Sequence, residues 1–256
     1  MYYTTVAQAR LPARPSAGLP TSPAPSPWPA SEERQFTIRM AHNRAREAAN
    51  ALLQRRYAWR GYRTVQLPSD QTGWRTTLSA HEATADGDTA IGTLTLEIDG
   101  GPEGLSAAAA FGPEIAALRA EGRRLVEFTR LAVETHSHSQ RVLAGLFHVG
   151  YIVAHKLRHY DTLLLEVNPR HVRFYERMLG CKVIGPVREH PGVGAPAVLL
   201  SAPFSYIRAQ IRAHAGTGDM PCDARSLYPF AFTADDESGI VARLLQAQFG
   251  GDTALH

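Results

Sequence analysis

Residues 163–185 hold two short apolar segments with a helix between them, and the connections are very short. The first segment, 163–167, ends at Asn168-Pro169, a pair that stops an extended run and suits the first turn of a helix. Gly180 then ends that helix before the second apolar segment begins. In chain order this pattern predicts a parallel strand–helix–strand crossover, a unit built into a sheet with helices on its faces.

Other parts of the chain alternate between strand-like and helix-like apolar spacing. Asp86-Gly87 suits the turn of a hairpin. We expect strands at 36–40, 74–83, 89–98, 124–133 and 197–200, and helices at 42–60, 113–121, 142–156, 205–213 and 235–249. This order predicts an α/β (α+β) fold, in which a mixed central sheet carries helices on both faces.

The first 34 residues differ in composition from the rest. They hold seven of the 17 prolines and few large apolar side chains, so they bury too little surface to offset the entropy of ordering. We therefore expect a Pro-rich flexible tail over 1–34. Residues 35–256 are expected to form a single domain with a C-terminal helical extension.

Composition narrows the function classes. A net charge of +3 is too small an excess to argue for nucleic acid. The two cysteines, Cys181 and Cys222, lie far apart without a metal-binding spacing, and this suits a reducing compartment. Neither a secretion signal nor a membrane-length apolar run is present. We expect a cytoplasmic protein, with peripheral membrane contact left open.

The predicted strand 124–133 carries two charges. Glu127 and Thr129 are expected on one face and Phe128 and Arg130 on the other, since side chains alternate along a strand. Charges on a central strand are costly unless they are paired or functional. An edge-strand salt bridge is the alternative for an isolated Glu-x-x-Arg. The neighbouring Asn168 block favours a functional site.

Several blocks together resemble the long-chain N-acyl amino acid synthases, which have a GNAT-like fold and are related to the autoinducer synthases. The blocks are Phe36-Thr-Ile-Arg39, Arg56 to Tyr62, Thr93 to Asp99, Gly122 to Val133, Glu166 to His171 with Phe174-Tyr175, and Ser226 to Phe230. The resemblance implies an acyltransferase with splayed parallel strands at its active site. It implies transfer of a long-chain fatty acyl group from acyl carrier protein to the amine of an amino acid, giving an N-acyl amino acid.

The same resemblance suggests roles for named residues. Glu127 would take the ammonium proton, Arg130 would order that carboxylate or bind the substrate carboxylate, and Tyr175 would protonate the leaving thiolate. The other expected substrate contacts are Asn168 and His171, the strand residues Phe128, Thr129 and Leu131, and the acyl-tunnel residues Phe147 and Tyr151. Core packing is the alternative for Phe147, Tyr151 and Tyr175, and helix capping is the alternative for Asn168.

The segment 136–145 bears on the acyl donor. GNATs that use acyl-CoA usually cradle the diphosphate on backbone N–H groups of a loop with two spaced glycines. Here Gln140 and Arg141 are followed by one glycine, Gly145. We therefore expect the acyl-phosphopantetheine of acyl carrier protein as donor, and no permanently bound cofactor. His136 and His138 lack a third ligand at a recognised spacing, so no metal site is expected.

Basic residues cluster in two parts of the sequence and suggest a docking surface for an acidic carrier. They are Arg119, Arg123, Arg124, Arg141, Lys156 and Arg158. A solvated basic face is an equal alternative. Two other functions also remain open: an autoinducer-type synthase that uses S-adenosylmethionine as acceptor, and a non-catalytic GNAT-like module that binds a lipid or an acyl carrier protein.

Overall fold

A computed structural model describes residues 5–10, 35–58, 66–67, 73–84, 87–135, 139–192, 194–218 and 226–249. The strands are β1 (Thr5–Arg10), β2 (Gln35–Met40), β3 (Arg75–Thr84), β4 (Gly87–Ile98), β5 (Leu125–Val133), β6 (Thr162–Val167), β7 (Lys182–Val183), β8 (Arg188–His190) and β9 (Ala195–Pro203). They form one mixed sheet of order β1-β2-β3-β4-β5-β6-β9-β7, and β8 pairs with β9. The predicted fold class is confirmed.

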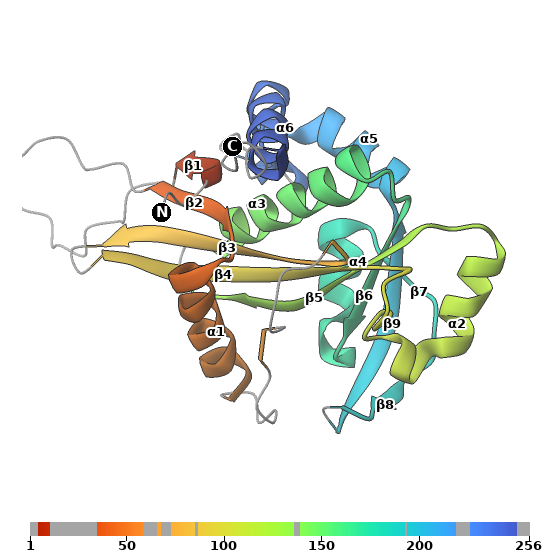
Figure 1. Ribbon diagram of the computed structural model, residues 1–256. Coiled ribbons are helices and arrows are strands. Elements are labelled where there is room, and N and C mark those ends of the chain that lie inside the picture. The colour runs from red at the N-terminus through yellow and green to blue at the C-terminus, as the bar shows by residue number, and fades with distance from the viewer. Residues whose placement is uncertain are drawn as a thin grey trace, which may run out of the picture.

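Helices cover both faces of this sheet (Figure 1). The helices are α1 (Asn43–Ala58), α2 (Ala108–Ala120), α3 (Ser139–Tyr151), α4 (Val172–Leu179), α5 (Phe204–His214) and α6 (Ala234–Phe249), with a π-helix at Ile152–Leu157 and 3-10 turns at Pro169–His171 and Tyr228–Phe230. Helices α1 and α2 pack on one face, whereas α3 packs on the other. None of the helices in the described ranges is long and apolar enough to cross a membrane.

The predicted crossover at 163–185 forms, but its two strands are not neighbours. Strand β9 lies between β6 and β7 and pairs antiparallel with both, so β6 and β7 are parallel to each other. The second strand of the crossover has only two residues, Lys182 and Val183. Strand β9 has nine residues and can therefore form more backbone hydrogen bonds along the edge of β6 than a two-residue strand can.

The prediction of a flexible tail over 1–34 is wrong for residues 5–10. They form β1, which pairs antiparallel with β2, and Val6 and Ala7 are fully buried. Arg243 of α6 donates from Nε to the Val6 carbonyl at 2.9 Å. Val6 and Ala7 are buried because α6 covers them. Composition could not indicate this contact, because it joins segments at opposite ends of the sequence.

Strands β5 and β6 separate part of the way along the sheet. Their parallel pairing covers only Leu125–Glu127 on β5 and Thr162–Leu164 on β6. Beyond these residues β5 continues to Val133 and β6 to Val167 without pairing to each other. The two strands therefore splay, as expected, and open a gap inside the sheet.

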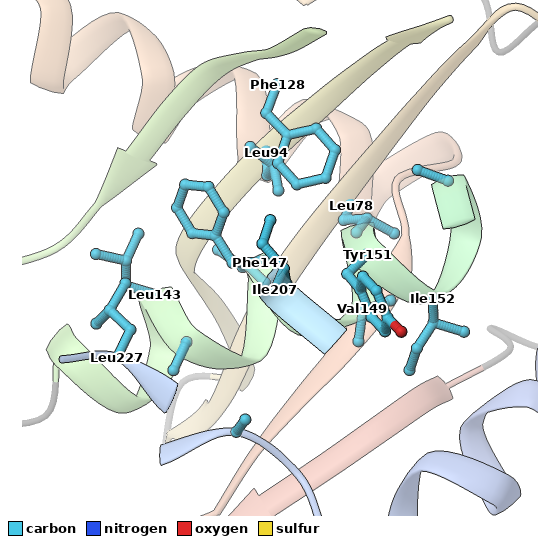
Figure 2. Packing of buried hydrophobic residues seen from close by; sticks show 14 of the residues in the cluster. Leu78, Leu94, Phe128, Leu143, Phe147, Val149, Tyr151, Ile152, Ile207 and Leu227 are labelled. Atoms are coloured by element: carbon cyan, nitrogen blue, oxygen red, sulfur yellow. The ribbon is translucent and has the colours of Figure 1, made fainter. Parts of the chain in front are cut away.

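The core between the sheet and α3 is aromatic next to this gap. Figure 2 shows Phe128 and Leu94 pointing from the strands toward the helix that carries Phe147. The ring centroids of Phe128 and Phe147 lie 5.7 Å apart. A Cβ at Gly150 would lie 2.8 Å from Cζ of Phe128, so the missing side chain makes room for that ring.

Gly150→Ala is expected to lower the free energy of unfolding by about 1–3 kcal/mol, because the added methyl group must displace the Phe128 ring. Gly112→Ala is the matched control, since Gly112 also lies in a helix and nothing lies within 4 Å of the position that a Cβ would take there. That variant should be neutral or slightly stabilising. Urea denaturation of both proteins measures the difference, and equal stabilities would contradict the close approach.

Candidate active site

A cavity of about 240 Å³ occupies the gap between β5 and β6. It is lined by Tyr57, Leu94, Ser106, Glu127, Phe128, Thr129, Arg130, Leu131, Phe147, Leu165, Glu166, Val167, Asn168, His171, Tyr175, His190, Ala195, Pro196 and Ala197. All three expected catalytic residues and six of the seven expected substrate-binding residues are brought together here.

The two sides of the cavity differ in chemistry. On the α3 side it is apolar and aromatic, with Phe128, Phe147 and Leu165 among the buried core residues. On the α1 and α2 side it presents Glu127, Glu166 and other polar groups. A molecule placed in the gap therefore meets an apolar environment on one side of the sheet and carboxylates on the other.

Two buried carboxylates lie side by side at the start of α2. Glu97 of β4 is directly paired with Glu127 of β5, so both side chains are on one face of the sheet. The N–H and hydroxyl of Ser106 donate to Glu97 Oε2 at 2.9 and 2.6 Å. The N–H of Ala107 donates to Glu127 Oε2 at 2.9 Å. Backbone donors at the helix N-terminus thus hold both carboxyl groups.

Arg130 lies on the same face as these carboxylates, so the predicted grouping of Arg130 with Phe128 is wrong. Between Thr129 and Ala132, β5 has one residue more than the opposing stretch of β4, and Arg130 has a φ of 50°. This bulge turns the side chain to Glu97, where Nη1 lies 2.6 Å from Oε1. Arg130 therefore pairs with Glu97 and not with Glu127; of the two expected roles, binding the substrate carboxylate stays a prediction.

The surroundings of these carboxyl groups set their pKa values apart. Burial and the nearby charge of Glu97 raise the pKa of Glu127 to about 8, against the opposing hydrogen bond from Ala107. Burial also acts to raise the pKa of Glu97, but the Ser106 hydroxyl and the Arg130 guanidinium bring it below its usual value. Glu97 is therefore the ionised partner of Arg130, and Glu127 is the carboxyl that titrates near neutral pH.

Asn168 acts as a helix cap and also lines the cavity. Its Oδ1 accepts a hydrogen bond from the Arg170 N–H at 3.2 Å, which starts the 3-10 turn at Pro169. Its Nδ2 donates to the Pro196 carbonyl at 3.3 Å. The capping alternative is confirmed, and the cap fixes the end of β6 where the strands splay.

His171 and Tyr175 both line the cavity from the segment that follows. The Tyr175 ring lies 6.4 Å from that of Phe147, measured between centroids. Tyr175 also packs against the hydrophobic core, and its ring lies 5.2 Å from that of the 39% exposed Phe174, so it combines core packing with a place at the cavity.

Tyr151 is not part of this cavity. It is 2% exposed and packs against Phe204 and His155 in the core behind α3. The helical spacing placed it correctly on the buried face of α3, but this face extends beyond the end of the gap. Tyr151 therefore packs in the core, where it lines a separate void of about 20 Å³ behind Phe128 and Phe147.

The six basic residues expected to dock a carrier do not form one rim, and none lines the cavity. Arg119 makes a two-point contact with Asp99, and Arg124 stacks on Tyr160, both near the start of β5. Arg141 lies over Phe230 at the start of α3, and Lys156 pairs with Glu237 of α6. Arg124 and Arg158 do lie together, since Arg124 Nη2 donates to the Arg158 carbonyl at 3.0 Å, whereas Arg141 and Lys156 contact other elements.

Sequence reasoning missed Glu97, Glu166 and His190 as site residues. Glu166 Oε2 lies 3.6 Å from His190 Nε2, and both side chains line the cavity. A usable signal existed for the two carboxylates, because each interrupts an otherwise apolar strand as Glu127 does. His190 follows no apolar pattern, so only the pairing of β8 with β9 reveals its position.

Within the described ranges, no group of three or more His, Cys, Asp or Glu side chains could hold a metal ion. His136 and His138, for which no metal site was expected, lie outside those ranges, as does Cys222. Cys181 is buried, and burial raises the pKa of its thiol to about 12, which suits a core residue.

Solved structures with a similar fold include an N-acyl amino acid synthase and N-acyltransferases, by their descriptions. The N-acyl amino acid synthase FeeM from uncultured soil microbes matches with a TM-score of 0.58 and 25% identity, over 69% of this chain and 94% of that one. An acyl-CoA N-acyltransferase from Pseudomonas aeruginosa matches with a TM-score of 0.44 and 17% identity, over 66% and 99%. A spermidine/spermine N-acetyltransferase from Vibrio cholerae matches with 0.46 and 14%, over 68% and 97%.

The fold that the chain shares with FeeM, together with the splayed-strand cavity, defines an acyltransferase. Residues 48–203, more than half of the chain, match the family model of the N-acyl amino acid synthase FeeM. The protein belongs to this N-acyl amino acid synthase family. Comparison with curated protein sequences gave no match.

Proposed function

We propose that the protein transfers a long-chain fatty acyl group from the phosphopantetheine thiol of acyl carrier protein to the amine of an amino acid. The observation that carries this proposal is the two-sided cavity. Its apolar side suits an acyl chain, and its carboxylate side suits an ammonium group that must lose a proton. The gap between β5 and β6 is where the thioester carbon would meet the nitrogen.

The proposed chemistry uses groups already positioned in the gap. The amine attacks the thioester carbon, and backbone N–H groups on the unpaired edge of β5 stabilise the oxyanion. Glu127 takes a proton from the nitrogen, the C–S bond breaks, and Tyr175 protonates the leaving thiolate. Arg130 stays paired with Glu97 through Nη1, and its Nη2 group can bind the substrate carboxylate.

The preference for a carrier-bound donor is supported by the packing of α3. Gly145 is the single glycine in the segment where a diphosphate cradle would need two. A Cβ there would lie 3.1 Å from Ile38 and 3.3 Å from Phe36, so this glycine serves close packing of α3 on the sheet. A phosphopantetheine thioester without the nucleotide needs no diphosphate cradle.

A long acyl chain is supported by the core beyond the cavity. Phe128 and Phe147 line the main cavity and also a smaller apolar void of about 20 Å³ behind them. Ile207 and Leu227 lie on the far side of this void, beyond the segment that matches the family model. Rotation of the two phenylalanine rings would join the spaces and lengthen the apolar channel.

The proposal is tested with purified protein, a mixture of amino acids, and either acyl carrier protein or CoA carrying the same acyl group. Mass spectrometry should detect N-acyl amino acids, with the carrier-bound donor giving the higher kcat/KM. S-adenosylmethionine supplied as the only acceptor should give no acylated product. Faster reaction with acyl-CoA would overturn the donor assignment, and acylated S-adenosylmethionine would favour the autoinducer-type alternative.

The pH dependence follows from the same base. Glu127 must be ionised to accept a proton, so kcat/KM for the amine should rise with pH and level off above about 8, the pKa of its carboxyl. The measurement uses acceptors whose amines have different pKa values. A midpoint that moves with the acceptor would show that the substrate amine, and not Glu127, controls the profile.

A further inference from the structure

Glu166 and His190 form a second acid–base pair in the cavity, on the same side of the sheet as Glu127. Leu164 is aligned with Glu127 across the parallel pair, and Glu166 lies two residues further along the same face of β6. His190 approaches from β8, with its Nε2 3.6 Å from Glu166 Oε2. The side chains of Glu166 and His190 are 13% and 16% exposed, whereas Glu127 is 1% exposed.

The proposed acyl transfer leaves one proton to be removed in every turnover. An ammonium and a thioester give an amide, a thiol and one H⁺. The ammonium gives up two protons: Glu127 takes one, and the other replaces the proton that Tyr175 gives to the thiolate. The proton on Glu127 must reach solvent before this buried base can act again.

Glu127 has no route of its own to solvent, because it is enclosed. One carboxyl oxygen is held by the Ala107 N–H, and the Glu97 carboxylate lies beside it. Glu166 is close enough for its charge to raise the pKa of Glu127 further. A proton on Glu127 is therefore transferred more easily to Glu166, which lines the cavity, than to any group in the protein interior.

The other groups that face Glu166 do not replace His190. Arg130 on β5 is paired with Glu97. His171 on the 3-10 turn, Tyr175 on α4 and Tyr57 on α1 also line the cavity, and the ion pair that the structure gives Glu166 is with His190. Burial raises the pKa of Glu166 to about 7, just below that of Glu127. A carboxyl with this value can both receive and release a proton near neutral pH.

We infer that Glu166 and His190 are the proton exit of the active site. Glu166 receives the proton that Glu127 has taken from the acceptor amine, and His190 passes it to solvent. This inference rests on the proposed function. It adds a relay of two positioned groups that the acyl-transfer chemistry itself does not require.

The test is chemical rescue of His190→Ala in a weakly buffered solution. We expect kcat to fall about 100-fold, the lower end of what a positioned acid–base group contributes. KM for the amino acid should change little. Added imidazole should restore kcat in a saturable way, because a small base can occupy the space of the deleted side chain. Glu166→Gln should show the same loss of kcat without rescue by imidazole.

Glu189→Gln is the matched control, since Glu189 is an exposed neighbour on β8 and does not line the cavity. It should retain the wild-type kcat in all buffers. Thermal melting of each variant separates loss of folding from loss of the relay. A kcat of His190→Ala that stays normal in weak buffer, or a loss that imidazole does not reverse in folded protein, would overturn the inference. Wild-type protein that forms no N-acyl amino acid would instead overturn the proposed function.

Discussion

Glu127→Gln is expected to lower kcat by about 100- to 10,000-fold while the protein still binds the acyl donor. The amide cannot accept the ammonium proton, yet it has nearly the shape of the neutral carboxyl. Burial raises the pKa of Glu127 to about 8, so the residue is largely neutral at pH 7 and the substitution should not disturb the fold. Product formation under saturating substrates measures kcat, and calorimetric titration with acyl carrier protein measures binding.

A stability measurement separates this prediction from a structural effect. The folded-state pKa of Glu127 lies above its unfolded value, so stability is lost as pH rises toward and through about 8. Glu127→Gln should remove that loss and be at least as stable as wild type at pH 9. Glu176→Gln, an exposed change on α4, should leave both kcat and stability unaltered. An active Glu127→Gln protein would show that another group takes the proton.

Glu97→Ala is expected to cost about 3–5 kcal/mol of unfolding free energy, because it leaves buried charge without its partner. The Glu97 side chain is 2% exposed and accepts hydrogen bonds from Ser106 and Arg130, and Arg75 lies 3.3 Å from it. Arg130 and the N-terminal turn before α2 would both lose their common acceptor. The midpoint of urea denaturation measures the loss.

The matched control for this change is an exposed ion pair. Glu121 lies 3.5 Å from Arg123, and both side chains are at least half exposed. Glu121→Ala should change stability by no more than about 1 kcal/mol, since such pairs are weak in water. A cost for Glu97→Ala as small as that of the control would show that its hydrogen bonds are not needed for folding.

Local pattern predicted the elements better than it predicted their pairing. Alternation correctly put Glu127 on the polar face of β5, but the bulge after Thr129 moved Arg130 to that same face. A bulge depends on the register with β4, which is a property of two strands and not of one. The insertion of β9 between β6 and β7 likewise depends on how three strands pair, which the pattern of any one strand does not show.

For the candidate site too, the residues in local motifs could be predicted, whereas those brought in by strand pairing could not. The block around Asn168 and the charged strand around Glu127 were sufficient to predict one wall each of the cavity. Glu166 and His190 line the gap from two strands, and Glu97 supports it from a third by binding Arg130; only the sheet order brings these three strands together. Tyr151 shows the reverse case, since helical spacing predicts a buried face but not where along the helix a cavity ends.

The contact between β1 and α6 has a consequence for how the chain is made. Arg243 reaches the Val6 carbonyl across 237 residues of sequence (Figure 1 shows β1 beside α6). At about 5–20 residues per second, the ribosome needs roughly 10–50 s to synthesise that interval. Strand β1 therefore leaves the ribosome long before the helix that covers it exists. Its apolar residues stay exposed to solvent, or bound by a chaperone, until synthesis is almost complete.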